Sequence, residues 1–152
     1  MVWRKKIIYN IWFKIYVGTP FSALAFYIAK NGLETTICHE NQSLFKNEQT
    51  IIDNNESNLV MDEYKEYLKY AENFDAKVVK GLNITVNALK QKLQDGNLVI
   101  LTGEIPNGYH AILLTGYDQD KFIVCEPLYK VKQNRTFEEV EKFMNTSIGK
   151  WL

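Results

Sequence analysis

The spacing of apolar residues divides the chain into a helical first part and a strand-rich C-terminal third. From Pro20, apolar residues recur at intervals of three and four, which predicts a helix that ends at Gly32 after Lys30 in its last turn. The same spacing predicts a second helix over Leu59–Phe74 and a third helix that begins after Thr85, a good N-cap residue. The first part of the chain is therefore expected to supply most of the helices.

The segment Met1–Ala25 has some features of a signal peptide or membrane anchor, namely a basic start, an apolar stretch and small residues near its end. Asn10, Lys14 and Pro20 interrupt the apolar stretch, and Lys14 would lie near the bilayer centre of a membrane span. We therefore interpret the segment as an amphipathic helix. Its inward-facing residues are expected to be Trp3, Ile7, Ile8, Ile11, Trp12 and Ile15.

Short apolar segments elsewhere predict strands. Leu33–Cys38 is rich in β-branched residues, and Ala76–Lys80 is a second short segment of this kind. Between them, His39–Asn58 is polar and predicts a long surface loop, a feature that is usually functional or mobile in a compact domain.

The C-terminal third predicts an antiparallel sheet. Leu98–Thr102 is a continuous apolar run suited to a strand buried on both faces, and Glu104–Gly108 has turn residues. Tyr109–Tyr117 and Phe122–Glu126 flank a short polar stretch and predict a β-hairpin. Thr136–Met144 begins with capping-box spacing and predicts a final helix. Helices followed by an antiparallel sheet indicate an α+β fold.

Composition limits the function classes. The 152 residues correspond to a single domain over 1–152, and 46% hydrophobic residues are enough for a core, which excludes intrinsic disorder as the main description. Lysine plus arginine and aspartate plus glutamate both number 18, so no net positive charge favours a nucleic-acid partner. Cys38 and Cys125 are interpreted as free thiols in a reducing compartment, which favours the cytoplasm. A Cys38–Cys125 bridge and a secreted or membrane-anchored protein are the alternatives.

His110 is the main candidate for chemistry, with Glu126 at the end of the neighbouring predicted strand as its partner. An imidazole that transfers protons needs such a carboxylate to fix its tautomer. A two-residue hairpin loop would place Glu126 opposite Leu113 and turn His110 to the other face. An odd loop, often with a bulge, would place Glu126 opposite Ile112 or Leu114. His110 then shares the face of Glu126, and it is a diagonal neighbour in the Ile112 register.

A nucleophile is harder to identify. Cys125 precedes Glu126, so strand alternation points the two side chains to opposite faces. Cys38 ends a predicted strand, whereas catalytic thiols usually lie at a helix N-terminus. Cys38, His39 and His110 lack the spacing of a metal site, and the chain has no phosphate loop, dinucleotide fingerprint or serine elbow. The sequence therefore predicts no cofactor and no metal.

Three segments of the C-terminal part resemble a known family, namely Asn97–Gly103, Gly108–Asp118 and Phe122–Pro127. They are similar to the bacteriocin-processing-peptidase-like group of papain-like cysteine peptidases, family thirty-nine. That family has a buried strand, then a histidine followed by apolar residues and Thr-Gly-Tyr-Asp, then a strand that ends in Asp-Pro. In the branch named peptidase thirty-nine-like, the similarity extends from Trp3 onward to Pro20–Ala25, Lys30–Leu33 and Phe137–Met144. The resemblance covers nearly the whole chain and implies a papain-like fold, with N-terminal helices packed on a C-terminal antiparallel sheet.

The resemblance also implies roles for single residues. His110 takes the place of the catalytic histidine, and Glu126 stands where the family has an orienting aspartate. The family nucleophile is a cysteine that opens the first helix, with a glutamine upstream for the oxyanion. If the helix after Pro20 is that helix, Thr19 replaces the cysteine. In the other alignment the cysteine helix precedes the segment at Trp3, and the domain is N-terminally incomplete. Neither alignment provides the nucleophile or the glutamine.

Three hypotheses follow. The first is a catalytically degenerate peptidase-like domain that binds a peptide or a protein partner, because an acid and a base without an attacking group do not form an acyl-enzyme. The second is an active cysteine peptidase that uses Cys38, or a nucleophile supplied by an upstream segment or another chain. The third is a structural domain without a binding cleft. Nucleic acid is not an expected partner in any of them, and the interrupted apolar stretch at the N-terminus disfavours a membrane.

Overall fold

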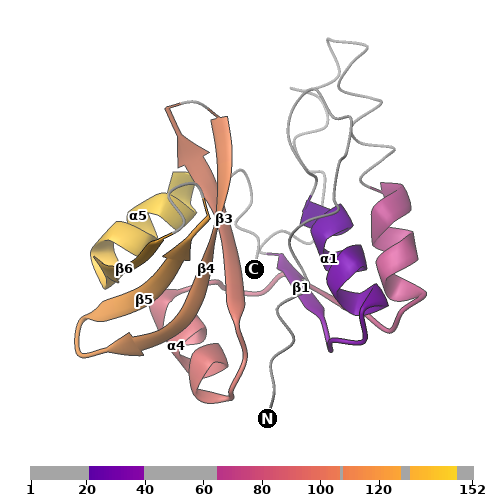
Figure 1. Ribbon diagram of the computed structural model, residues 1–152, viewed down its shortest axis with the longest axis horizontal. Helices are drawn as coiled ribbons and strands as arrows, with labels where there is room; N and C mark the ends of the chain where they lie inside the picture. Colours follow the sequence, from indigo (N-terminus) through magenta and orange to yellow (C-terminus); the bar gives the residue numbers. More distant parts are fainter. Residues whose placement is uncertain (1–20, 40–64, 107, 128–130, 147–152) are drawn as a thin grey trace.

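The computed structural model describes residues 21–39, 65–106, 108–127 and 131–146, which form a two-stranded sheet, a four-stranded sheet and the helices around them (Figure 1). In chain order the elements are α1 (Phe21–Lys30), β1 (Thr36–His39), a helix over residues 65–72, β2 (Lys77–Lys80), α4 (Val86–Gln94), β3 (Val99–Ile105), β4 (Gly108–Asp118), β5 (Lys121–Glu126), β6 (Val131–Thr136) and α5 (Phe137–Thr146). The α+β fold class predicted from the sequence is confirmed.

The helix boundaries follow the capping residues of the sequence. The Oγ1 atom of Thr85 accepts a hydrogen bond from the backbone N–H of Ala88 at 3.2 Å, which caps α4 as predicted. At the start of α5, the backbone N–H of Glu139 donates to Thr136 Oγ1 at 3.2 Å, and the backbone N–H of Thr136 donates to Glu139 Oε2 at 2.7 Å. Gly32 follows α1 with a φ of 79°, a conformation that glycine adopts without strain. These three predictions are confirmed.

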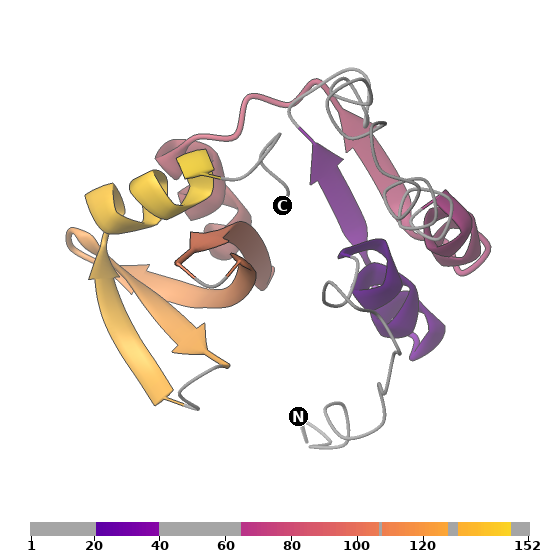
Figure 2. The ribbon, with the colours of Figure 1, turned by 90° about the horizontal axis from the view of Figure 1, so that it is seen from above.

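The main core lies between one face of the four-stranded sheet and two helices. The strand order is β3-β4-β5-β6 and all neighbouring pairs are antiparallel. Helices α4 and α5 cover the same face, which we call the inner face (Figure 2). The fully buried residues of this core on the sheet and the two helices are Leu89, Val99, Leu101, Ile112, Leu114, Phe122, Val124, Val140 and Met144. Their alternation along the strands shows which side chains point inward.

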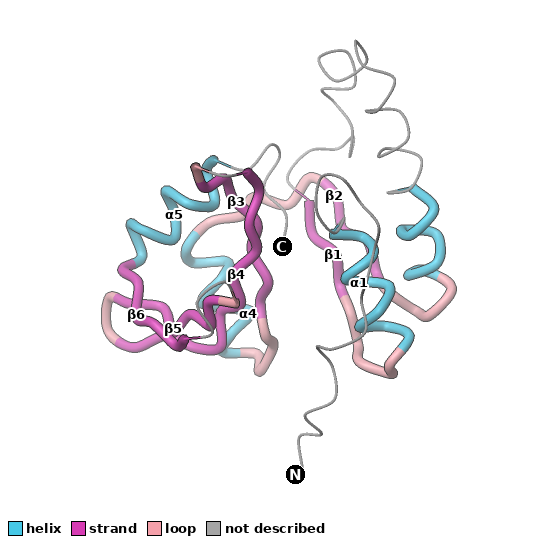
Figure 3. The backbone as a smooth tube through the Cα atoms, turned by 45° about the horizontal axis from the view of Figure 1, so that its top comes forward, coloured by secondary structure: helices cyan, strands magenta, loops and turns pink. Residues whose placement is uncertain are grey.

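The remaining elements form a smaller unit next to this sheet. Strands β1 and β2 pair in parallel, and α1 lies beside the helix over residues 65–72 (Figure 3). Phe26 of α1 contacts the rings of Tyr67, Tyr70 and Phe74, with ring centroids between 5.7 and 6.0 Å apart. Cys38 of β1 belongs to the main core, so β1 contacts the core of the large sheet.

Some predictions differ from the structure or lie outside the described residues. Strand β6 has no counterpart in the sequence predictions. The predicted strand Leu98–Thr102 corresponds to the start of β3, except that Leu98 precedes the strand and is exposed. Val99 and Leu101 are buried, whereas Ile100 and Thr102 are half-buried, so the expected burial on both faces is wrong. The N-terminal amphipathic helix, Thr19, most of the polar loop and the first turn of the second helix lie outside the described residues. Within the described part of the chain, no helix has the length and apolar character needed to cross a membrane.

Candidate functional site

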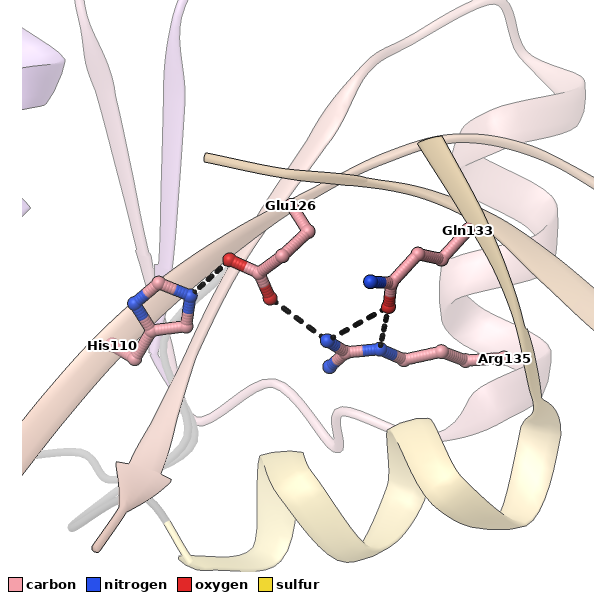
Figure 4. A network of polar contacts seen from close by, with 4 residues as sticks. All are labelled: His110, Glu126, Gln133 and Arg135. Carbon is pink, nitrogen blue, oxygen red and sulfur yellow. Dashed lines mark hydrogen bonds and ion pairs between the residues drawn. The ribbon is translucent and has the colours of Figure 1, made fainter. Parts of the chain in front are cut away.

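His110 on β4 and Glu126 on β5 meet on the inner face of the sheet. The Nε2 atom of His110 lies 2.5 Å from Oε1 of Glu126 (Figure 4). Both side chains are enclosed, with 14% of the His110 side chain and 2% of the Glu126 side chain exposed. The pair proposed from the sequence is therefore in direct contact in a place from which water is largely excluded.

A β-bulge in β4 brings the two residues together. The loop between β4 and β5 has two residues, and at its end Asp118 pairs with Lys121, a register that would turn His110 away from Glu126. Between Leu114 and Gly116 the register shifts by one residue, so that Leu114 pairs with Val124. Continuing this register places Glu126 opposite Ile112, two residues from His110.

The hairpin thus combines the loop length of one predicted arrangement with the strand register of the other. The two-residue loop is present, and the Ile112 register expected only for an odd loop is present too. The extra residue is Thr115 of β4, whose Oγ1 donates to the carbonyl oxygen of Ile123 at 3.4 Å. The adjacent Gly116 could have indicated this bulge, because a glycine inside a strand often marks one.

Two residues of β6 complete the polar network and were not identified from the sequence. Nη2 of Arg135 donates to Oε2 of Glu126 at 2.8 Å, so that the carboxylate contacts His110 and Arg135 through different oxygens (Figure 4). Oε1 of Gln133 lies 3.4 Å from both Nε and Nη2 of Arg135. A buried carboxylate needs hydrogen bonds and compensating charge, and the permanently charged guanidinium provides both. Apart from Val131, strand β6 consists of polar residues, so no alternation of apolar and polar residues indicates which side chains face inward.

The end of α5 packs over His110 because β3 has a glycine at this level. Gly103 pairs with His110 in the sheet, and the ring of Phe143 in α5 lies edge-on to the imidazole with centroids 6.5 Å apart. A Cβ atom on Gly103 would lie 2.4 Å from the carbonyl oxygen of Phe143 and 2.7 Å from its ring carbons. Only glycine at this position lets Phe143 pack closely against the sheet and the imidazole.

The contact with Glu126 determines which nitrogen of His110 is available. An ionised carboxylate only accepts hydrogen bonds, so Nε2 of a neutral ring carries the proton and Nδ1 has the free electron pair. Within the described residues, Nδ1 of His110 has no hydrogen-bond partner. The arrangement can therefore accept a hydrogen bond or a proton at Nδ1 while Glu126 orients the ring.

Neither cysteine has the surroundings of a nucleophile. The Cys38 side chain belongs to the main apolar core, and its burial raises the pKa of the thiol against the opposing effect of Lys92. Cys125 is half-buried on the outer face of β5, as predicted, because Val124 and Glu126 on either side of it point inward. Both cysteines are free thiols. No cluster of metal-ligating side chains occurs in the part of the chain that the structure describes.

A comparison with protein families matches residues 19–152 to the Peptidase_C39 like family. The chain belongs to this family. The match covers every described element, from α1 to α5, and begins at Thr19. The resemblance inferred from the sequence and its papain-like α+β fold are thus confirmed. Searches of curated proteins and of solved structures found no match.

Membership of the Peptidase_C39 like family relates the contact between His110 and Glu126 to the histidine and the acid of that family. The resemblance places the family histidine at His110 and the family acid at Glu126, and the structure holds these two residues in contact. The longer side chain of glutamate, compared with the aspartate of the family, still reaches Nε2.

Proposed function

We propose that this chain is a catalytically degenerate domain of the Peptidase_C39 like family that binds a peptide next to His110. The observation that carries the proposal is the His110–Glu126 pair, retained with its Nδ1 atom free within the described residues, in a part of the chain that offers no activated thiol. An acyl-enzyme needs an attacking group beside the base, and a thiol in an apolar core does not provide one.

The retained pair supports binding because its polar groups stabilise the fold less than apolar side chains would. Burying a carboxylate and an arginine costs desolvation energy that their attraction often only balances. A peptide N–H or hydroxyl could donate to Nδ1 of His110, whose ring Glu126 holds in place. Recognition of a peptide is therefore a use for the pair that needs no nucleophile.

Binding is tested with a dye-labelled pool of random decapeptides, measured by fluorescence polarisation and by changes in the NMR signals of the His110 ring. We expect the pool to bind and to shift these signals. His110→Ala should weaken binding about tenfold, the effect of losing one or two well-placed hydrogen bonds in a site. His39→Ala removes the other histidine of the chain and is the matched control. Failure of the pool to bind, or equal weakening in both variants, contradicts the proposal.

Cleavage is tested on the same peptide pool by mass spectrometry. We expect the peptides to remain intact with the wild-type protein. Cleavage that is lost in both His110→Ala and Cys38→Ala would show an active cysteine peptidase. Cleavage that is lost in His110→Ala and retained after both cysteines are replaced would show a different nucleophile. Either result refutes catalytic degeneracy.

The reactivity of the thiols provides an independent test. Because burial raises the pKa of Cys38, we expect iodoacetamide to label it slowly at pH 6–7 and more quickly after unfolding in urea. Rapid labelling of the folded protein at pH 6, reduced by His110→Ala, would indicate a thiolate–imidazolium pair and would favour the active peptidase.

A further inference from the structure

We propose that the inner face of β6, next to the His110–Glu126 pair, is a subsite for an uncharged carbonyl group of a peptide and an apolar side chain beside it. Gln133 and Arg135 donate hydrogen bonds to the carbonyl oxygen, and Val131 contacts the apolar side chain. The inference rests on the proposed function, because it adds a second point of contact for the peptide that His110 binds. It gives Gln133 and Arg135 a role beyond their contacts with each other and with Glu126.

The register of β6 places three of its side chains on the inner face, namely Val131, Gln133 and Arg135. Their partners on β5 are buried residues that point inward, in the same order Glu126, Val124 and Phe122. Directly paired residues have their side chains on the same face of a sheet. The first of the three side chains of β6 is therefore level with Glu126.

Helix α5 leaves the start of β6 uncovered. The helix follows β6 directly, and its first residue, Phe137, packs on Phe122. Further along the helix, Phe143 lies over Gly103 of β3, the strand at the opposite edge of the sheet. The helix therefore moves away from β6 along its length, and Val131 is 44% exposed although it lies on the inner face. Within the described residues, this end of β6 is an open part of the inner face.

Gln133 and Arg135 have hydrogen-bond donors that their own contacts leave unused. Oε1 of Gln133 accepts from Nε and Nη2 of Arg135 at 3.4 Å each, and Nη2 also donates to Oε2 of Glu126 at 2.8 Å. Nη1 of Arg135 and Nε2 of Gln133 have no hydrogen-bond partner among the residues that the structure describes. Each of these nitrogens carries two N–H bonds and accepts none. A ligand on this face therefore meets unused donors.

The donors are held in place before a ligand binds. Contacts with Glu126 and Gln133 fix the guanidinium, and the amide nitrogen of Gln133 and the terminal nitrogens of Arg135 lie on the side that faces Glu126 and His110 (Figure 4). Donors that are already ordered lose little conformational freedom on binding, so more of each hydrogen bond contributes to affinity. Only the carboxyl group of Glu126 separates His110 from Arg135, so one short peptide segment spans both.

The surroundings of these donors favour a carbonyl oxygen over an acidic group. Arg135 already has an acidic partner in Glu126 at 2.8 Å, so a second acid would compete for the same cation. A carbonyl oxygen needs only N–H donors, and every residue of a peptide has one. The exposed Val131 favours an apolar side chain on the same peptide, because their contact removes apolar surface from water.

The test uses N-acetyl-leucine methylamide, an uncharged compound with peptide carbonyl groups and one apolar side chain. It is titrated into the full chain, and binding is followed by the NMR signals of the side-chain N–H groups of Gln133 and Arg135. We expect these signals to shift until the site is saturated. The side-chain amide of Asn134 should keep its position, because Asn134 pairs with Ile123 and lies on the outer face.

A pair of variants isolates the donors of Gln133. Gln133→Glu removes the N–H groups and keeps an oxygen for Arg135, and Asn134→Asp makes the same chemical change on the outer face as the matched control. We expect Gln133→Glu to bind the compound about tenfold more weakly, the effect of losing a well-placed hydrogen bond, and Asn134→Asp to bind like the wild type. Gln133→Leu is the second variant if Gln133→Glu does not fold. Equal affinities in the two variants, or wild-type Gln133 signals that do not shift, overturn the inference.

The chemistry of the ligand is tested with two related compounds. N-acetyl-glycine methylamide lacks the apolar side chain and should bind about threefold more weakly, roughly the effect of one buried methylene group. This difference should be smaller in Val131→Thr, which replaces a methyl group by a hydroxyl group. N-acetyl-leucine, which ends in a free carboxylate, should bind no better than the methylamide. Equal binding of the leucine and glycine methylamides, or a preference for the free acid, contradicts the ligand that we assign.

The outcome for the subsite can be separated from the outcome for the proposed function. If the methylamide shifts the Gln133 signals but the random decapeptide pool does not bind, the subsite exists and the proposed binding of a peptide next to His110 is wrong. If the pool binds and shifts the His110 signals, while neither the pool nor the methylamide shifts those of Gln133, the proposed function stands and the subsite on β6 is refuted.

Discussion

The two ends of the inner face of the sheet are built in opposite ways. At the end near the β4–β5 turn, Phe122 packs against Phe137 and Tyr117, with ring centroids 4.8 and 6.3 Å apart. At the other end, the same face carries His110 and Glu126, and Arg135 reaches in from β6. We call these the aromatic end and the polar end. Both ends belong to β4 and β5, and α5 contacts both of them, through Phe137 at the aromatic end and Phe143 at the polar end.

The aromatic end consists of residues whose burial stabilises the fold, whereas the burial of the polar end adds little to the free energy of unfolding. Burial of large rings at the aromatic end is favourable for each ring, and ring–ring contacts add to it. At the polar end, charged and polar groups lose hydration, and their contacts recover about the same amount of free energy. A sheet selected for stability alone would gain from apolar residues at both ends. The polar end is therefore the part of the inner face whose composition points to a function.

The largest expected effect comes from breaking the aromatic end. Phe122→Ala removes a fully buried ring and leaves a cavity next to Phe137 and Tyr117. We expect the free energy of unfolding to fall by about 3–5 kcal/mol, measured by urea unfolding. In the fraction that stays folded, the NMR signals of the His110 ring should keep their wild-type positions. A loss below about 1 kcal/mol would contradict the stabilising role that the comparison assigns to this end.

An intermediate effect is expected from the polar end. Glu126→Leu removes the acceptor of His110 and a counter-charge of Arg135, and it should lower the free energy of unfolding by about 1–3 kcal/mol. The triple variant His110→Leu, Glu126→Leu and Arg135→Met makes the region apolar and should recover most of this loss.

The informative quantity is the difference between the single and the triple variant. Urea unfolding should place the triple variant near the wild type, while the random decapeptide pool no longer binds it. If the triple variant is less stable than Glu126→Leu alone, the polar network contributes to stability more than the comparison allows. If the triple variant still binds the pool, the polar end is not the binding site.

The smallest effect concerns pH and the core thiol. Because burial raises the pKa of Cys38 above the ordinary value of 9.0, the unfolded chain loses this proton first as the pH rises. The contribution of the neutral thiol to stability is therefore complete below about pH 8 and declines above pH 9, by at most about 1.4 kcal/mol per pH unit. Urea midpoints at pH 7.5 and 10 should differ less in Cys38→Ala than in the wild type. Cys125→Ala, on the outer face, is the matched control, and the same reduction in this variant would contradict the assignment.

The elements that the sequence predicted best have local causes. The caps of α4 and α5 depend on residues three positions apart, such as Thr136 and Glu139, and the end of α1 depends on Gly32. Apolar spacing predicted most of the strands and helices of the described chain for the same reason. Such signals lie within one turn or one strand, where a single sequence contains the whole interaction.

The features that the sequence did not predict depend on partners distant in the chain. Strand β6 has almost no apolar residues, since it lies at the edge of the sheet, so its pattern does not differ from that of a polar loop. The inward orientation of Arg135 follows from its pairing with Phe122, which no local pattern reveals. The sequence alone does not determine whether His110 and Glu126 meet, because the register of a hairpin depends on irregularities within its strands as well as on the length of its loop.

The extra residue at Thr115 uncouples the tip of the hairpin from the far ends of its two strands. The tip keeps the tight turn that its own residues favour. On the His110 side of Thr115, each side chain of β4 faces the side of the sheet opposite to the one it would face without the extra residue. Deleting Thr115 would consequently send His110 and Glu126 to opposite sides of the sheet without altering either of them. Adding one residue to the turn would compensate for that deletion. The insertion at the tip and the deletion of Thr115 would each abolish the contact between His110 and Glu126, and together they would restore it.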